Sequence, residues 1–361
     1  MIASMNTPAS KSTEPSAQIV PAPTQPLAAP VESALPPLAA TAEDDSAAEA
    51  IARALAEPAR TAEEAVARPL ILVVHASVGS GHRSAANAIA EALEEAGEAA
   101  RAAGDDNSLE ARSEVRVLDI LDFGRIVFDG DKTASMFTGW TRPFYDLTWR
   151  YTLTGRLLWG GGTIWARLMY PKFTEYVRRL RPAAIVATHI TAANVAVSAR
   201  MITGQSFPIV CVPTDYEAEG LWPHLHTDLF CVANESMAET LRPRCVPEDR
   251  ILITGIPASP AFSRTYDRAE AREAFGLPQD KQVVLALAGA KLPQPYVHFR
   301  AAIGEMLPFM HAMPSMQLVI VAGADEDYER ELRRQVAEYG LTNVTVLGYV
   351  NAMAELMEAA D

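Results

Sequence analysis

The sequence is poor in cysteine and in positive charge, and it has no long apolar run. Its three cysteines form no CxxC pair, which excludes a fold built on a disulfide framework. Acidic side chains number 45 against 31 basic ones, so the net charge is −14. This balance excludes nucleic acid as the main partner, because neutralising phosphates needs a basic surface. No apolar run approaches the ~20 residues of a membrane-spanning helix. We therefore expect a cytoplasmic protein that is soluble or attached to one face of a membrane.

The first 68 residues also lack aromatic residues, glycine, histidine and cysteine. Alanine and proline dominate there, and such a composition cannot bury enough apolar surface to offset the entropy of ordering. Residues 1–68 are therefore predicted to be a disordered tail, in which the Ala- and Glu-rich stretch 43–67 can form a helix interrupted at Pro58. No secretory signal is predicted, because the segment has neither a basic start nor a continuous apolar core.

From Pro69 onward, short apolar runs alternate with amphipathic segments. The run 69–76 is continuous, rich in β-branched residues and followed by glycines, which is typical of a strand buried on both faces. Alternating strands and helices predict an α/β fold with parallel sheets and helices on both faces. We expect an N-terminal domain at 69–256, a linker at 257–280 rich in proline and charge, and an incomplete second domain at 281–361.

Nine strands are expected in these two domains, and Ser236 with Glu239 predicts a capping box that opens a helix between the fifth and sixth. The expected strands are 69–76, 114–121, 183–188, 208–212, 229–232, 251–254, 282–288, 317–322 and 343–347.

The loop 77–83 lies between the first predicted strand and its helix. In an open parallel sheet, ligands bind outside the carboxyl ends of the strands. Gly79 and Gly81 let the backbone approach a ligand, and the free N–H groups at the helix start favour a diphosphate. The loop is not a Walker P-loop, and Ser84 stands where a dinucleotide fingerprint has its third glycine. We therefore expect Gly79, Ser80 and Gly81 to contact a diphosphate, which the resemblance described below identifies with that of a sugar donor.

His82 falls in the first turn of that helix. Proximity to a helix N-terminus lowers imidazole basicity and favours the neutral form, which can accept a proton from an attacking hydroxyl. The sequence leaves two interpretations open: a general base, or a histidine that caps or packs at a helix start.

Ordered blocks of sequence resemble a known family. The segment Ala76-Ser-Val-Gly-Ser-Gly-His-Arg-Ser-Ala-Ala-Asn-Ala-Ile89 resembles the N-terminal signature of monogalactosyldiacylglycerol synthases and processive diacylglycerol glucosyltransferases. More distantly, it is similar to the bacterial enzyme that adds N-acetylglucosamine to lipid II precursors. Later blocks follow in the family's order over residues 69–361: Thr188-His189, Pro213-Thr-Asp215-Tyr216 with Trp222, Thr254-Gly-Ile-Pro257 with Pro260, and Leu347-Gly-Tyr349 with Met353, Met357 and Ala360-Asp361.

The resemblance implies a GT-B type fold of two Rossmann-like parallel-sheet domains with the active site between them. The N-terminal domain would take a lipid acceptor and the second domain a nucleotide sugar, usually UDP-linked. His82 would deprotonate the acceptor hydroxyl, His189 and Asp215 would lie at the crevice, and Gly289 would contact the donor. Neither a metal nor a cofactor is implied, because the UDP-sugar is a co-substrate.

Three features depart from the family pattern. Glu219 stands where the family usually has a histidine four residues after the Thr-Asp aspartate. The glycine-rich loop after the first strand of the second domain is reduced to Ala288-Gly289-Ala290-Lys291-Leu292-Pro293. The chain also stops before the family's Lys-Pro-Gly-Gly-Xaa-Thr and Glu stretch, so the resemblance implies a C-terminally truncated member.

An aromatic and basic island occupies residues 131–172. It holds nine aromatic residues and six basic against two acidic side chains. Trp and Tyr favour the headgroup region of a bilayer, and Lys and Arg are attracted to anionic lipid. We expect this island to contact a membrane surface, the other interpretation being a helical layer packed on the sheet. The expected contact residues are Trp140, Arg142, Phe144, Trp149, Arg150, Trp159 and Trp165.

The sequence as a whole favours a hexosyltransferase that moves a sugar from a UDP-hexose to diacylglycerol or a similar lipid, in glycolipid biosynthesis. Two alternatives stay open. A truncated, non-catalytic lipid-binding protein would bind vesicles without UDP-sugar affinity. A nucleotide-sugar epimerase on the same fold would need no lipid. The sugar, the acceptor lipid and the oligomeric state are not determined by the sequence.

Overall fold

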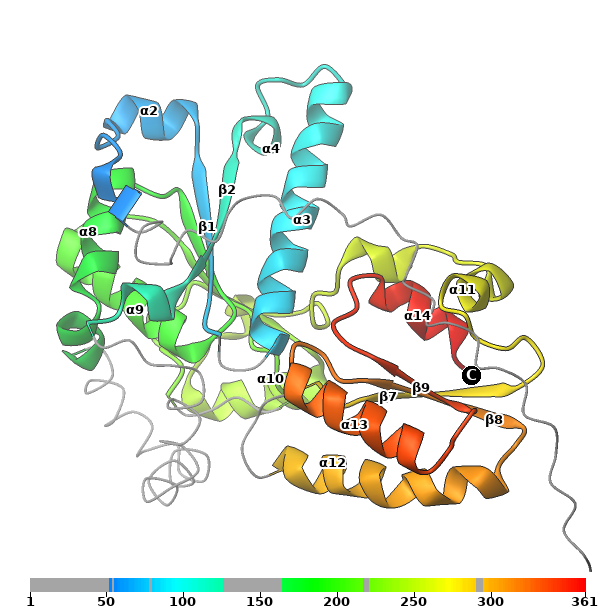
Figure 1. Ribbon diagram of the computed structural model, residues 1–361. Helices are drawn as coiled ribbons and strands as arrows, with labels where there is room; N and C mark the ends of the chain where they lie inside the picture. Colours follow the sequence, from blue (N-terminus) through cyan, green and yellow to red (C-terminus); the bar gives the residue numbers. More distant parts are fainter. Residues whose placement is uncertain (1–51, 54, 78–79, 126–163, 217–220, 290–294) are drawn as a thin grey trace, which may run out of the picture. The chain divides into compact units, whose positions relative to one another are not determined.

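The computed structural model describes residues 52–53, 55–77, 80–125, 164–216, 221–289 and 295–361 (Figure 1). Two parallel sheets organise these residues, with strand orders β2-β1-β3-β4-β5-β6 and β7-β8-β9. The predicted α/β fold with two Rossmann-like sheets is confirmed, and each strand lies within the range expected for it or starts one residue earlier. The strands are β1 (Leu70–His75), β2 (Glu114–Asp119), β3 (Ala184–Ala187), β4 (Ile209–Cys211), β5 (Leu229–Val232), β6 (Ile251–Ile253), β7 (Gln282–Leu287), β8 (Met316–Val321) and β9 (Val344–Leu347).

Helices connect the strands and cover the sheets. In Figure 1, α3 lies on one face of the first sheet, against β1 and β2, while α8 and α9 pack together on the other. The helices are α2 (Ala62–Ala67), α3 (Ser80–Ala102), α4 (Leu109–Arg112), α8 (Pro171–Leu180), α9 (Ile190–Thr203), α10 (Glu235–Leu241), α11 (Arg268–Ala274), α12 (Pro295–Met306), α13 (Glu326–Glu338) and α14 (Met353–Ala359). Short 3₁₀ turns are η1 (Ile120–Phe123), η2 (Arg242–Arg244), η3 (Glu248–Arg250), η4 (Pro260–Ser263) and η5 (Leu307–Ala312).

The strand order of the first sheet reverses at β1. The chain runs from β1 outward to β2, then returns to β3 on the other side of β1. In doubly wound sheets a crevice opens outside the carboxyl ends of the two strands that flank such a reversal, and ligands bind there. The topology therefore places the residues that follow β1 and β3 at the natural ligand position of this sheet.

The second sheet is buried on both faces. Leu318 and Ile320 of β8 pack on the side of α12 and α13, whereas Val319 and Val321 pack with residues of α11 and α14. Alternate residues of one strand thus enter two separate apolar clusters. This two-sided burial explains why the sequence of β8 is continuously apolar over residues 318–321.

The predicted linker 257–280 is wrong for its second half, which folds as part of the second sheet's unit. Asp267 caps α11 by accepting a hydrogen bond from the Glu270 backbone N–H. Ala271 and Leu277 are buried against α14. The error arose because α11 is short and mostly polar, with one narrow apolar edge.

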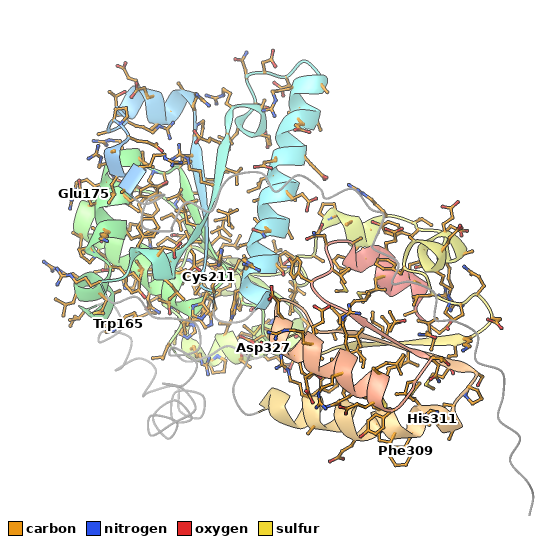
Figure 2. All side chains as sticks on the ribbon, in the orientation of Figure 1. Trp165, Glu175, Cys211, Phe309, His311 and Asp327 are labelled. Carbon is orange, nitrogen blue, oxygen red and sulfur yellow. The ribbon has the colours of Figure 1, made fainter. Side chains whose placement is uncertain are left out.

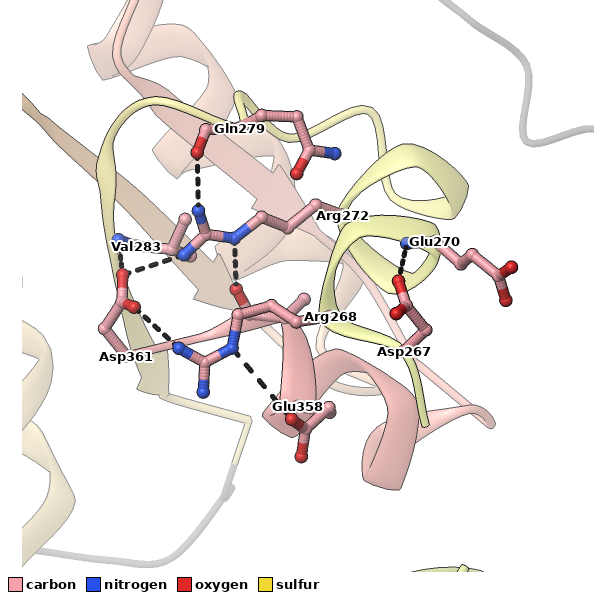
Figure 3. A network of polar contacts seen from close by, with 9 residues as sticks. Asp267, Arg268, Glu270, Arg272, Gln279, Val283, Glu358 and Asp361 are labelled. Carbon is pink, nitrogen blue, oxygen red and sulfur yellow. Dashed lines mark hydrogen bonds and ion pairs between the residues drawn. The ribbon is translucent and has the colours of Figure 1, made fainter. Parts of the chain in front are cut away.

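Arg272 fixes α11 to the rest of that unit (Figure 3). Its buried guanidinium donates to the backbone carbonyls of Ala359, Gln279 and Lys281 and, at 2.8 Å, to the Asp361 carboxylate. The same carboxylate accepts the Val283 backbone N–H at 2.8 Å. These contacts hold the Asp361 pKa below its usual range, the Val283 bond contributing most. One arginine therefore joins α11, the start of β7 and the end of α14.

The predicted tail also extends too far. Leu55 packs against the core of the first sheet, and Glu57 pairs with Arg116 on the edge strand β2 at 3.1 Å. Thr61 and Glu64 form a capping box at the start of α2. These residues are ordered mainly by polar contacts, which a composition lacking aromatic side chains does not reveal.

The helix between β5 and β6 begins earlier than predicted. Its N-cap is Asn234, whose side chain accepts the Met237 backbone N–H at 3.0 Å, so the predicted capping box of Ser236 and Glu239 is wrong. Asparagine is as good an N-cap as serine.

Candidate functional site

His82 is held by two segments that are distant in the sequence. It is the third residue of α3, the helix that follows β1, and it is half-buried. Its Nδ1 lies 2.9 Å from the backbone oxygen of Thr188, after β3, and 2.9 Å from the hydroxyl oxygen of Thr214, after β4. The Thr188 hydroxyl donates back to the His82 carbonyl at 2.9 Å. Three strand ends thus meet on one imidazole, at the reversal of strand order.

These contacts fix the protonation of the ring. A carbonyl oxygen only accepts hydrogen bonds, so Nδ1 carries the proton and Nε2 carries the lone pair of the neutral imidazole. Within the described residues, no hydrogen bond occupies Nε2. Nε2 is therefore a basic nitrogen that no described residue occupies.

Burial lowers the His82 pKa below its usual value, and the Thr188 hydrogen bond and the charge of Asp215 oppose this shift. The imidazole is thus neutral at pH 7. It keeps the ability to take up a proton because a carboxylate lies near it. The combination suits a general base.

His189 has a structural explanation that the sequence did not give. It is the N-cap of α9, and its Nδ1 accepts the Thr191 backbone N–H at 3.1 Å. Its buried ring meets the His82 ring edge-on, with centroids 4.6 Å apart. Burial, followed by the charges of His82 and His75, holds its pKa well below the usual range. His189 therefore packs against the His82 ring. Asp215, by contrast, is exposed on the loop after β4.

A third histidine completes the group. His75 ends β1, pairs in register with Asp119 at the end of β2, and is 5% exposed. Its Nδ1 is buried and has no side-chain hydrogen-bond partner among the described residues. Burial lowers its pKa, while Asp119 opposes the shift. In the described part of the chain, no three His, Cys, Asp or Glu side chains are grouped so that they could hold a metal ion.

The glycine loop is described only in part. Gly79 lies outside the described residues, and for Ser80 only the backbone, at the start of α3, is described. Gly81 is exposed, and a Cβ placed on it would have no heavy atom within 4 Å. The open space is compatible with a ligand, and the predicted phosphate contact remains a prediction.

Gly289 has a clear packing role. A Cβ placed on it would lie 2.7 Å from the Cα of Gly323, the second residue after the neighbouring strand β8. Gly323 itself has a φ of +65°. The need for glycine at 289 is thus explained by close backbone packing, whatever contact it makes with a donor. Beside it, Arg300 pairs with Asp325 at 2.9 Å and lies over the Tyr328 ring at 4.1 Å.

Most of the aromatic island lies outside the described residues, including Trp140, Arg142, Phe144, Trp149, Arg150 and Trp159, as does Glu219. Trp165 is described, on the helical stretch 164–169, and lies at the periphery of its unit (Figure 2). Its ring packs edge-on against Tyr170 at 5.4 Å and is 41% exposed, beside Ile164 at 63% and Leu168 at 57%. An apolar face therefore points to solvent here. Helices of the described residues are all too short or too polar to cross a bilayer.

Sequence reasoning missed the roles of Thr188 and Thr214. Both belong to blocks that were noticed, and in each the hydroxyl residue stands beside the residue that was chosen. The sequence signal that could have indicated these roles is a threonine that follows a strand and directly precedes a histidine or an aspartate. Their convergence on one ring depends on strand order, which the sequence does not state.

Comparisons with known proteins agree with the motifs. Residues 82–258 match the family model described as monogalactosyldiacylglycerol (MGDG) synthase. A processive diacylglycerol beta-glucosyltransferase of Staphylococcus carnosus is 32% identical over 155 residues, which are 43% of this chain and 38% of that protein. Another of Bacillus licheniformis is 25% identical over 198 residues, 55% of this chain and 49% of that protein. The resemblance to this family is confirmed, and the chain spans less than half the length of these curated relatives.

Solved structures of low sequence identity are also similar. A UDP-GlcNAc 2-epimerase from Neisseria meningitidis, bound to UDP-GlcNAc, has a TM-score of 0.49 at 12% identity and covers 81% of this chain and 76% of its own. An Anabaena protein in complex with UDP and glucose has a TM-score of 0.44 at 15% identity, covering 81% and 72%.

Proposed function

We propose that this relative of monogalactosyldiacylglycerol synthases is a glycosyltransferase that transfers a hexose from a UDP-sugar to diacylglycerol or a similar membrane lipid. The single observation that carries the proposal is His82, whose Nδ1 is bonded to Thr188 at the reversal of strand order and whose Nε2 has no hydrogen-bond partner among the described residues. The curated relatives' names supply the lipid acceptor and the sugar.

The chemistry assigned to His82 is a single proton transfer. Nε2 takes the proton of the acceptor hydroxyl as the O–H bond breaks, and the oxygen lone pair forms the new bond to the anomeric carbon. The bond from that carbon to the diphosphate breaks, and UDP leaves with the electron pair. The imidazolium formed keeps its Nδ1–H bond to Thr188, and the negative charge of Asp215 favours it. A base of this kind contributes about 10²–10⁴ in rate.

We further propose that Gly79, Ser80 and Gly81 contact the donor diphosphate at the start of α3. Three features support this: the backbone N–H groups of a helix start, the open space beside Gly81, and the place after β1. No resident metal or cofactor is part of the proposal, because the UDP-sugar brings its own leaving group.

The proposal also places the protein peripherally on the cytoplasmic face of a membrane. The exposed apolar side chains of Ile164, Trp165 and Leu168 share one short helical stretch with the exposed Arg167. An apolar face beside a basic residue suits the interface of an anionic bilayer. Sedimentation with phosphatidylglycerol vesicles tests this: the protein should sediment with them, and should remain in solution with vesicles of phosphatidylcholine alone.

The decisive experiment supplies the protein with vesicles containing diacylglycerol and with labelled UDP-glucose or UDP-galactose. Labelled glycolipid and released UDP are the expected products. His82→Gln should lower the rate by about 10²–10⁴, because the amide has no basic nitrogen. His311→Gln is the matched control, since His311 is exposed and lies in the second sheet's unit.

The outcomes separate the alternatives. Vesicle binding without UDP affinity would favour a non-catalytic lipid-binding protein. A soluble sugar product formed without lipid would favour an epimerase. Glycolipid formation that His82→Gln leaves within a few-fold of the unaltered protein would show that another group is the base.

A further inference from the structure

Thr214 is the second partner of His82, and the general-base assignment does not account for it. Its hydroxyl oxygen is as close to Nδ1 as the Thr188 carbonyl is, 2.9 Å in each case. The two contacts come from the ends of different strands, 106 and 132 residues from His82 along the chain. A ring that already has one acceptor for its proton does not need another to define its tautomer. The question is what the second oxygen adds.

The direction of the Thr214 hydrogen bond follows from its neighbour. If the hydroxyl donated to Nδ1, that nitrogen would carry no proton. The Thr188 carbonyl oxygen, 2.9 Å away, would then face a nitrogen that has no hydrogen to donate to it. With the proton on Nδ1, both oxygens accept it in a shared, three-centre bond. Thr214 therefore acts as an acceptor toward the ring.

An acceptor at Nδ1 favours the imidazolium over the neutral ring. Hydrogen bonds to charged groups are stronger than those to neutral ones. The Thr214 oxygen consequently stabilises His82 most when Nε2 has taken up a proton, which is its state late in the proposed reaction. Two oxygens on one N–H also fix the plane of the ring, so that Nε2 keeps one direction.

We infer that Thr214 is a positioning residue, which orients the His82 ring and selectively stabilises its protonated form. The inference rests on the proposed function for its catalytic meaning, but its physical content concerns only the ring. It assigns a role to the threonine of the Pro213-Thr-Asp215 block that is separate from the role of the neighbouring aspartate.

Other charged and titratable groups around the ring also affect the equilibrium between the neutral and the protonated form of His82. Asp215 follows Thr214 on the loop after β4, and His189 contacts the ring from α9. His75 ends β1 and interacts with the charges of Asp119 on β2, of His82 and of Arg83, which follows His82 on α3. None of these groups is altered by a change at Thr214, so its effect can be isolated.

The test is nuclear magnetic resonance of the full chain labelled with ¹⁵N in histidine, with the His82 signals assigned by their loss in His82→Gln. Long-range proton–nitrogen correlations should show the proton on Nδ1 at pH 8. In Thr214→Val, which keeps the shape and loses the oxygen, the His82 pKa should fall further below its usual value. Thr214→Ser, which keeps the oxygen and loses the methyl group, should restore it.

Thr203→Val is the matched control. Thr203 is also half-buried, and its hydroxyl donates to the Ala199 carbonyl near the far end of α9. This variant should leave the His82 pKa unchanged. In the glycolipid assay, the kcat of Thr214→Val should fall about tenfold with little change in KM. The acidic limb of the variant's pH–rate profile should move to lower pH, because the His82 pKa is lower.

Several results would overturn the inference. A proton on Nε2 of the unaltered protein would reverse the hydrogen-bond argument, and this measurement needs no variant to fold. An unchanged pKa in Thr214→Val, or an equal shift in Thr214→Ser, would reduce Thr214 to a packing residue. An absence of glycolipid synthesis by the unaltered protein would reject the proposed function and leave the ring measurements standing.

Discussion

Replacing Gly289 by alanine should destabilise the second sheet specifically. The new Cβ would lie 2.7 Å from the Gly323 Cα, 2.9 Å from its nitrogen and 3.1 Å from the Ala322 carbonyl carbon. All three atoms belong to backbone, so no side chain can rotate away. Ordinary carbon contacts are ~3.5–4.0 Å, so the ends of β7 and β8 would have to separate by about 1 Å.

The cost follows from what that separation disturbs. Overpacking of this kind costs about 1–3 kcal/mol. The Ala288 N–H donates to the Val321 carbonyl at 2.8 Å beside the contact, and weakening this bond costs up to about 1 kcal/mol. Alanine also lowers the conformational entropy of the unfolded chain, which offsets about 0.4–1 kcal/mol of this loss of stability. The free energy of opening the sheet should therefore fall by about 1–3 kcal/mol. This decrease corresponds to amide exchange that is about 5- to 150-fold faster.

Hydrogen exchange followed by mass spectrometry is the suitable assay. All five tryptophans stand at position 222 or earlier, so intrinsic fluorescence does not report on the second sheet. Peptides covering β7 and β8 should lose protection in Gly289→Ala, while those of β1 and β3 should not.

Gly304→Ala provides the matched control in the same unit. Gly304 is inside α12, and its nearest heavy atom is the Gln335 side-chain oxygen, 3.9 Å from the added Cβ. Alanine there should stabilise by about 0.5–1 kcal/mol. Unchanged protection of β7 and β8 in Gly289→Ala would refute the packing argument.

Two further predictions concern charge and surface. Asp122 is exposed as a residue, but desolvation of its carboxyl, followed by the charge of Asp119, raises its pKa to about 6. The stability that its protonation contributes is complete below about pH 4 and is lost as the pH rises through 6. Asp122→Asn should therefore raise Tm at pH 7.5 more than at pH 5, whereas an equal gain at both would contradict this. Leu168 is 57% exposed, and Leu168→Glu should weaken binding to phosphatidylglycerol vesicles about tenfold, because an apolar contact of ~1 kcal/mol is replaced by repulsion. Met201→Glu, at a side chain 58% exposed on α9, should bind as the unaltered protein does, and equal losses would argue against a defined contact face.

Local chemistry made the strands predictable. The run that became β1 is apolar and rich in β-branched residues, and β8 is continuously apolar over residues 318–321 because both of its faces are buried. Helix boundaries were harder to predict, since Asn234 and Ser236 are both good N-caps and the helix begins after Asn234. The segment 267–277 was taken for linker although Asp267 followed by Glu270 at the N3 position is a capping signal.

The site could be predicted only one residue at a time. His82 was identified from its place after a strand, and the blocks around 188 and 214 were noticed separately. That Thr188 and Thr214 meet on Nδ1 follows from the pairing of β1 with β3 and of β3 with β4, which sequence periodicity does not specify. The packing role of Gly289 was not predicted because its partner, Gly323, is 34 residues away and lies outside any local motif, while the donor contact that the resemblance implies for Gly289 stays a prediction.

The Arg272 network has a consequence for the order in which a ribosome-bound chain can mature. Arg272 bonds Ala359 and Asp361 across 87 and 89 residues, so α11 and β7 stay without these partners until position 361 has left the exit tunnel. The contacts of His82 are complete once Thr214 has emerged, 361 − 214 = 147 residues earlier. The histidine site can thus be assembled during synthesis, while the attachment of α11 through Arg272 waits for closure of a long loop, the slower kind of step.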